Sequence, residues 1–343
     1  MIITITEHWN QWLEVFPHDR RDVYFYEEYI KLYADNNQQA VCYVYEDNGR
    51  VLLFPFLLRS FEFEGKAYYD FETAYGYGGP ISNVEDKDFT DVALHQFIEF
   101  CKSQNYLAGF VRFCPLLQNQ KMCDGTFPVL MDRHTVAMNL DMPIDDVWMN
   151  EVHTKNRNVI KKGEKEGLTF EADYDFKYLN EFIALYNQTM DKLDADGFYY
   201  FGDSYYQQLV STLSNNFLGV VKQEDRIISA AIFFHSDKYG HYHLSGSDKS
   251  ALRLMPNNFM LWNAAKELHS RGVKYCHFGG GTTSSDEDSL LCFKRKFSKS
   301  LYDFYLGKIV FNSDVYTKVC QEWEERNPER KEAFKYFLLK YKY

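Results

Sequence analysis

Two clusters of cationic side chains stand out in this chain, although its 343 residues carry a formal net charge of −11. They are Lys155-Asn156-Arg157 with Lys161, Lys162 and Lys165, and Lys294-Arg295-Lys296 with Lys299. Lysine and arginine side chains grouped in this way can bind phosphate oxygens. Each cluster is therefore a candidate anion site, with a solvated helix face as the alternative interpretation.

The spacing of the first cluster suits a helix. Arg157, Lys161 and Lys165 are four residues apart, so on a helix they form one stripe. An acidic protein is a poor non-specific partner for nucleic acid or an anionic membrane, so a polyanion would have to bind at such a local patch. The GxGxxG and GxxxxGK[ST] patterns are both absent, which argues against dinucleotide and P-loop chemistry. We expect no DNA partner.

Histidine and cysteine spacing gives no metal signature. His241 and His243 share one face of an expected strand, but a metal site needs further ligands of matching geometry. The seven cysteines include no CxxC pair and suit a reducing compartment. The N-terminus lacks a signal-peptide pattern, and the densest apolar run, Val51 to Leu58, is too short to span a bilayer. The sequence thus predicts a cytoplasmic protein with no bound metal and no transmembrane segment.

The elements that position these residues follow one order twice. In the first half we expect strands at 41–45, 51–58 and 66–75, a helix through Leu94, Phe97, Ile98 and Cys101, and a strand at 106–113. In the second half we expect strands at 217–221, 227–235 and 239–246, a helix through Leu261, Ala264, Ala265 and Leu268 that stops at Gly272, and a strand at 273–278. Helical segments precede each half, at 23–33 and 179–190, and a last helix is expected at 327–343. This pattern predicts an α/β (α+β) fold with an internal duplication.

Several segments resemble the Fem (FemABX) family over nearly the whole chain. They are the repeat itself, the loop Tyr75-Gly76-Tyr77-Gly78-Gly79-Pro80, the helix start Lys155-Asn156-Arg157, and Gly279-Gly280-Gly281 followed by Asp288-Ser289-Leu290-Leu291-Cys292-Phe293-Lys294-Arg295-Lys296-Phe297. Fem enzymes make peptidoglycan cross-bridges by moving an aminoacyl group from a charged tRNA to an amine of a UDP-linked or lipid-linked muropeptide. The resemblance implies two tandem GNAT-like domains, residues 1–145 and 146–343 with the C-terminal helix, each a mixed, mostly antiparallel, twisted sheet flanked by helices.

The resemblance also implies roles for individual residues. Lys294, with Phe293 beside it, would be catalytic and would place positive charge near the developing oxyanion or the donor ester. Substrate-binding residues would be Arg157 (on an acceptor phosphate), Lys161, Tyr75, Tyr77, Gly79, Asn258, Gly280 and Gly281. The alternative is structural: Phe293 and Phe297 would be core residues at i, i+4, and the glycines would form a plain turn.

The identity of the acyl donor stays open. GNAT enzymes that bind acetyl-CoA carry a Q/R-x-x-G-x-G/A loop whose backbone N–H groups hold the pyrophosphate. The equivalent stretch here, Arg253-Leu254-Met255-Pro256-Asn257-Asn258, has no glycine. We therefore expect no tightly bound cofactor, and a donor that is either aminoacyl-tRNA or acyl-CoA.

The leading hypothesis is an aminoacyl- or acyltransferase acting on an amine of a cell-envelope precursor. Its partners would be a UDP-linked or lipid-linked muropeptide or sugar and, in one version, aminoacyl-tRNA, with peripheral membrane contact allowed. One alternative is an acyl-CoA-dependent N-acyltransferase on a nucleotide sugar or small amine. Another is a non-catalytic binding module of the same fold.

Overall fold

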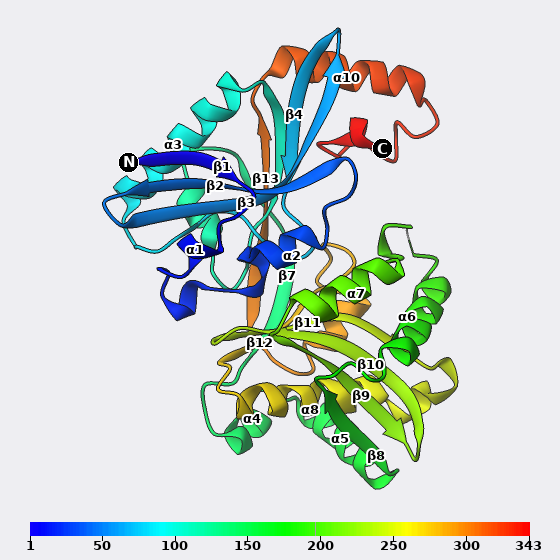
Figure 1. The fold of residues 1–343 in the computed structure, drawn as a ribbon. Coiled ribbons are helices and arrows are strands. Elements are labelled where there is room, and N and C mark those ends of the chain that lie inside the picture. The colour runs from blue at the N-terminus through cyan, green and yellow to red at the C-terminus, as the bar shows by residue number, and fades with distance from the viewer. Residues whose placement is uncertain (196) are drawn as a thin grey trace. The chain divides into compact units, whose positions relative to one another are not determined.

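The computed structural model describes residues 1–195 and 197–343 (Figure 1). The chain forms two compact units, Met1–Asp132 with Asp303–Tyr343, and Arg133–Tyr302. This division differs from the expected one at residue 145, because the last forty or so residues lie in unit 1, not with the second half of the chain. Among the described residues, no helix combines the length and the apolar character needed to cross a bilayer.

Unit 1 is a mixed sheet with helix α3 packed on it. Its strands run in the order β1-β2-β3-β4-β6-β13, where β13 is Leu301–Val310, and β5 pairs with β3. Its elements are β1 (Ile2–Thr6), α1 (Asn10–Leu13), α2 (Glu27–Lys31), β2 (Gln38–Asp47), β3 (Arg50–Phe63), β4 (Lys66–Glu72), β5 (Ile81–Ser82), α3 (Lys87–Ser103), β6 (Tyr106–Arg112) and α10 (Ser313–Arg326). The pair β4–β6 is parallel, and the other pairs are antiparallel.

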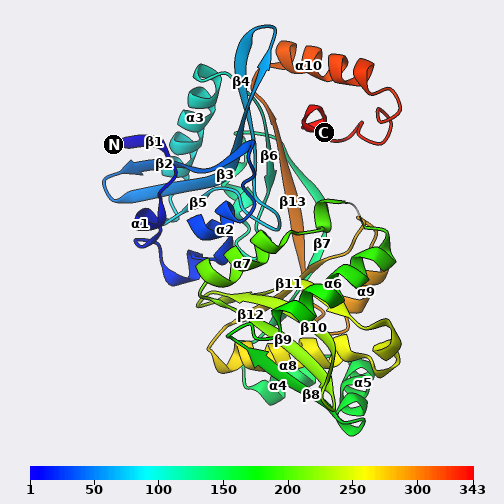
Figure 2. The ribbon, with the colours of Figure 1, turned by 45° about the vertical axis from the view of Figure 1, so that its right-hand side comes forward.

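Unit 2 repeats this plan in the order β7-β12-β11-β10-β9-β8, where β7 is Val129–Asn139. Its elements are α4 (Ile144–Asn150), α5 (Thr154–Lys165), β8 (Leu168–Asp173), α6 (Leu179–Leu193), α7 (Asp203–Thr212), β9 (Asn216–Gln223), β10 (Arg226–His235), β11 (Tyr239–Ser247), α8 (Pro256–Ser270), β12 (Tyr275–Gly280) and α9 (Ser289–Lys294). Among the strand pairs that the described residues of unit 2 form, β11–β12 is parallel and the others are antiparallel. Figure 2 shows α8 on one face of this sheet and α6 on the other.

The predicted duplication is confirmed strand by strand. The series β2-β3-β4-α3-β6 matches β9-β10-β11-α8-β12, and in both a helix crosses over between the two parallel strands. Short turns fix the hairpins: Asn48 (φ 52°) and Gly49 (φ 79°) join β2 to β3 and leave Asp47 opposite Arg50. Positive φ at both central residues is what a tight hairpin turn requires.

The last strand of each unit comes from the other half of the sequence, which explains why the boundary differs from the expected one. Strand β7 (Val129–Asn139) follows the first repeat along the chain, yet its second part pairs with β12 of unit 2. Strand β13 (Leu301–Val310) follows the second repeat but pairs with β6 of unit 1. Each closing strand is thus supplied by the other half of the sequence, a pairing that local patterns do not encode.

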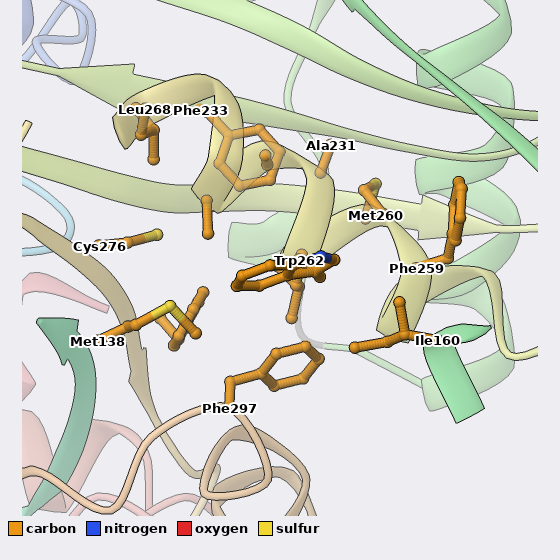
Figure 3. Packing of buried hydrophobic residues seen from close by; sticks show 14 of the residues in the cluster. Met138, Ile160, Ala231, Phe233, Phe259, Met260, Trp262, Leu268, Cys276 and Phe297 are labelled. Carbon is orange, nitrogen blue, oxygen red and sulfur yellow. The ribbon is translucent and has the colours of Figure 1, made fainter. Parts of the chain in front are cut away.

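Helix α8 is the centre of the unit 2 core (Figure 3). Phe259, Met260, Trp262 and Leu268 are buried and pack against Met138 of β7, Cys276 of β12 and Ile160 of α5. Burying one large apolar side chain contributes roughly 1.5–3 kcal/mol. This shared core joins α5, α8 and β12 to one another.

The predicted C-terminal helix at 327–343 is wrong. The helix of this region is α10, which ends at Arg326, and the chain after Asn327-Pro328 forms turns that end in a single 3-10 turn at Lys340–Lys342. Proline has no backbone N–H and commonly follows a helix end. The tail is held by ion pairs instead, from Lys340 to Glu324 and from Lys342 to Glu72.

Candidate functional site

The parallel strands β11 and β12 of unit 2 separate part-way along their length. They pair at three positions, the last being His241 opposite His277. Beyond this point β11 stays with β10 up to Ser247, and β12 stays with β7 up to Gly280. Past this point the backbone groups of β11 and β12 do not pair with each other, so they are candidates for hydrogen bonds to a ligand.

A β-bulge lies on β11 next to this separation. Ala231 pairs with Ser245 and Phe233 with Tyr242, so His243 and Leu244 both face the single residue between them on β10. Bulges change the direction in which side chains point and are frequent beside active sites. Here the bulge accompanies a hydrogen bond between His243 Nε2 and the Tyr205 hydroxyl of α7, at 2.9 Å.

The matching pair in unit 1, β4–β6, stays together. Its ladder runs to Glu72 opposite Phe110, and Thr73 then donates to the Phe110 carbonyl at 3.0 Å. Gly78 donates to the Arg112 carbonyl at 2.7 Å, and the Arg112 guanidinium forms an ion pair with Glu72 at 3.3 Å. The two units therefore differ where their folds correspond, and the opening between parallel strands belongs to unit 2.

Lys294 lies at the end of α9 and reaches back to β12. Its side chain is buried, with 6% of the residue exposed, and its Nζ donates to the Gly280 carbonyl at 2.6 Å. Burial lowers the pKa of this amine from 10.5 to about 7, against the opposing effect of the Asp288 carboxylate. Near neutral pH the side chain can therefore act either as a cation or as a neutral amine.

Three histidines occupy one side of the same region. His241 and His277 are each 1% exposed, and their rings meet edge to face with centroids 5.7 Å apart. The pKa of His277 is lowered by burial and by the neighbouring His241 and Lys294, and burial together with His241 lowers that of His243 to about 3. His243 and His277 are therefore neutral at pH 7, whereas the charge of Lys294 varies near that pH.

The glycine-rich run ends in a loop fixed by Asp288. The Asp288 carboxylate caps α9 by accepting from the N–H groups of Leu290 and Leu291, and it also accepts from Thr282 and Thr283. A Cβ atom at Gly281 would lie 2.4 Å from Asp288 Oδ1, so only glycine allows this approach. The predicted contact of Gly280 and Gly281 with substrate stays a prediction, beside these structural roles.

The remaining unit 2 candidates are tied into the fold. Phe293 packs edge to face on Phe297 and borders the core, as the structural alternative proposed. Asn258 donates to Asn156 at 2.6 Å, and Asn156 donates to the Lys296 carbonyl at 3.2 Å. Through this chain of amides, α8 and α5 are joined to the segment that follows Lys294.

Arg157 uses its guanidinium to cap α4. Its Nη1 donates to the carbonyls of Trp148, Met149 and Val152, at 3.3, 3.1 and 2.7 Å, and its Nη2 donates to Thr154. Carbonyls at a helix C-terminus attract cations. Lys161, one turn further along α5, is exposed. The expected acceptor-phosphate contact of Arg157 and the expected substrate contact of Lys161 stay predictions.

Tyr75, Tyr77 and Gly79 lie in unit 1, at the end of β4. The Tyr75 carbonyl accepts from the Tyr29 hydroxyl at 2.8 Å, and the Tyr77 ring packs edge to face on Tyr24. Gly79 has φ 90°, and a Cβ there would meet Asn119 and Phe113 at 2.9 Å. The glycine is thus required by its own fold, while the predicted role of the two tyrosines in an acceptor groove stays a prediction.

Neither a metal site nor the GNAT glycine loop is formed by the described residues. In residues 1–195 and 197–343 no group of three or more His, Cys, Asp and Glu side chains could hold a metal ion. Before α8, Met255 adopts the left-handed conformation (φ 54°) and Pro256 begins the helix. Proline lacks the N–H that a pyrophosphate-binding loop would offer at that position.

Comparison with known proteins places the fold. Residues 151–288 match the family described as acetyltransferase (GNAT) domain. The crystal structure of FemX superposes with a TM-score of 0.69 at 16% identity, covering 92% of this chain and 99% of that chain. The chain has the fold of FemX. No curated protein matches the sequence.

Two further structures share the FemX-like fold. The C-terminal domain of a putative lysylphosphatidylglycerol synthetase from Agrobacterium fabrum gives a TM-score of 0.54 at 14% identity, covering 90% of this chain and 94% of that one. L-PGS from Bacillus licheniformis gives 0.52 at 14% identity, covering 87% and 90%. The predicted tandem GNAT-like fold is confirmed, and the matched domain supports the predicted acyltransferase class.

Sequence reasoning missed two parts of the site. His277 was expected only as part of a strand, and Asp288 only as part of the run that resembles the Fem family, so neither was given a role in the site. Alternation along 275–280 could have put His277 on the face opposite Cys276, because side chains alternate along a strand. The pairing of His277 with His241 needed the strand order, which the sequence alone does not supply.

Proposed function

We propose that the protein transfers an activated acyl or aminoacyl group onto an amine of a cell-envelope precursor, with unit 2 holding the reacting groups. The observation that carries the proposal is Lys294, a buried amine with a pKa of about 7 beside the point where β11 and β12 separate. The likeness in fold to FemX and to proteins named for lysylphosphatidylglycerol supports the same class of substrate.

Acyl transfer to an amine requires few protein side chains. A neutral amine of the acceptor attacks the carbonyl carbon of an ester or thioester, and negative charge develops on the carbonyl oxygen. The ester or thioester bond then breaks, and the tRNA hydroxyl or CoA thiol leaves with the proton that the amine gives up. Protonated Lys294 would donate to that oxygen in a low-dielectric site, where such a contact is strongest. The imidazoles of His243 and His277, neutral at pH 7, add no competing positive charge. Lys294 would then supply the positive charge at the reacting carbonyl.

Acceptor binding is assigned by the resemblance. Tyr75 and Tyr77 would line the acceptor groove, and a cation of α5 would bind an acceptor phosphate. Because Arg157 already donates to the end of α4, the proposal gives the phosphate contact mainly to the exposed Lys161. Exchanging Lys161 for alanine would then raise the acceptor KM and leave kcat nearly unchanged, since a contact made equally in ground and transition states affects binding alone.

The decisive experiment is turnover of Lys294 variants. We expect Lys294→Ala to lose about 10²–10³-fold in kcat, the usual effect of removing one oxyanion donor. Lys299→Ala is the matched control, because Lys299 belongs to the same basic cluster and is exposed. Full activity in a folded Lys294→Ala protein would refute this role for Lys294.

The donor is tested by ligand-dependent stability. Aminoacyl-tRNA is favoured by the fold of FemX and by the lack of glycine in residues 253–258. The competing reading, an acyl-CoA-dependent N-acyltransferase, is favoured by the match to the acetyltransferase (GNAT) domain. A true donor stabilises by RT ln(1 + [L]/Kd), roughly 2.7 kcal/mol at a hundredfold excess over Kd. Stabilisation by a CoA thioester and not by charged tRNA would overturn the preferred donor.

The same experiments separate an enzyme from a binding module. A non-catalytic module of this fold would be stabilised by a ligand and would turn over no donor. Turnover that depends on Lys294 excludes that alternative.

A further inference from the structure

The loop between β12 and α9 is closed by a single carboxylate. Asp288 Oδ2 accepts from the backbone N–H and the hydroxyl of Thr282, at 3.1 and 2.7 Å, and from the N–H and hydroxyl of Thr283, at 3.0 and 3.1 Å. Asp288 Oδ1 accepts from Leu290 and Leu291, at 2.9 and 3.0 Å. These donors lower the pKa of Asp288 well below its usual range and keep it charged.

A second contact joins α9 to β12 at the C-terminal end of α9. Lys294 Nζ donates to the carbonyl of Gly280, the residue directly before Gly281. Gly281 in turn is held from β7, because Arg133 Nη1 donates to its carbonyl at 3.0 Å. Helix α9, which has six residues, lies between these two contacts, and Asp288 caps its first turn. The direction from which Lys294 reaches Gly280 is therefore set by the position of Asp288.

We propose that Asp288 is a positioning residue for Lys294: by fastening the loop 281–283 to the start of α9, it holds the lysine amine at the Gly280 carbonyl. The catalytic part of this inference rests on the proposed function. The contacts of Asp288 with the loop and of Lys294 with Gly280, here called the Asp288–Lys294 lock, do not depend on any transfer reaction.

Charge and geometry act together in this lock. The Asp288 carboxylate raises the pKa of Lys294 against the lowering effect of burial. Two other charged or titratable groups near this segment are His277 on β12, whose pKa is lowered by burial, by His241 and by Lys294, and Arg133 on β7, which donates to the Gly281 carbonyl. Loss of the carboxylate leaves the effect of burial unopposed, so Lys294 gives up its proton at lower pH.

The direct test follows the protonation of Lys294 itself. Protein with ¹³Cε-labelled lysine is titrated by NMR, with the Lys294 signal assigned by its absence from Lys294→Met. In Asp288→Asn we expect the Lys294 midpoint to move to lower pH than in the wild type. Asp286→Asn is the matched control, because Asp286 is two residues away and its carboxylate lies instead 3.7 Å from His134; its midpoint should equal that of the wild type.

Two variants keep the charge and change only the geometry. Gly281→Ala places a methyl group where Asp288 Oδ1 lies, and Thr283→Val removes one hydroxyl donor. Both should shift the Lys294 midpoint in the same direction as Asp288→Asn, and the smaller change, Thr283→Val, guards against a variant that fails to fold. A Lys294 midpoint that is unchanged in folded Asp288→Asn would overturn the proposal.

Activity then distinguishes the two levels of inference. If transfer is detected, Asp288→Asn should lower kcat and move the basic limb of the pH–rate profile to lower pH, with little change in KM. If no transfer is detected with any donor while the NMR midpoint still shifts, the proposed function fails and the lock between Asp288 and Lys294 stands.

Discussion

Replacing Lys294 by methionine should change how the stability of the protein depends on pH. Methionine is unbranched and of similar length, so it fills the space of the lysine stem and removes only the amine. The wild-type amine has a pKa of about 7 in the folded protein, lowered from 10.5 mainly by burial. Between these two values the unfolded chain binds a proton that the folded protein does not.

The sign and size follow from proton linkage. Because the unfolded state binds more protons in this window, the free energy of unfolding of the wild type rises with pH from about 7 to 10.5. One pKa unit corresponds to about 1.4 kcal/mol, so the whole window is worth about 5 kcal/mol. Between pH 7 and pH 9 the wild type should gain about 2 kcal/mol that Lys294→Met does not gain.

Urea unfolding of both proteins between pH 7 and pH 9 measures this difference. His243 and His277 titrate below this range, since burial lowers both pKa values. We expect Lys294→Met to be the more stable protein at pH 7, with an advantage that shrinks toward pH 9. Stability curves that run parallel across the range would refute the assignment of a lowered pKa to Lys294.

Three further substitutions test the structure elsewhere. Arg59→Ala removes the partner of the Asp70 carboxylate, which is 1% exposed, and should cost about 3–5 kcal/mol in urea unfolding, with Asp70→Asn in the same background restoring part of it. Gly109→Ala places a methyl group 2.2 Å from the Phe71 ring and should lower Tm by overpacking worth about 1–3 kcal/mol; an unchanged Tm would contradict the packing. Arg157→Ala leaves the carbonyls at the end of α4 without their hydrogen-bond donor and should lower the free energy of unfolding by about 1–3 kcal/mol. A raised acceptor KM at unchanged stability would instead favour the phosphate-binding role of Arg157.

Most elements could be predicted from the sequence because their signals are local. Asn48-Gly49 between two apolar runs specifies a hairpin, and the helix through Leu94 and Cys101 shows its buried face at helical spacing. The same order of elements in both halves, together with the run from Gly279 to Phe297, was enough to indicate the tandem GNAT-like fold. The prediction of a helix after Pro328 was wrong because ion pairs to distant residues, which sequence periodicity does not reveal, hold this tail.

Tertiary structure decided the features that depend on residues distant in the chain. Which closing strand joins which unit is set by backbone pairing of β7 with β12 and of β13 with β6. Whether Arg157 is available to a ligand depends on the carbonyls of α4, and the pKa of Lys294 depends on how completely its neighbours exclude water. Sequence spacing identifies the residue types that could do chemistry. Pairing, burial and charge in the folded state determine which of them are positioned and tuned to do it.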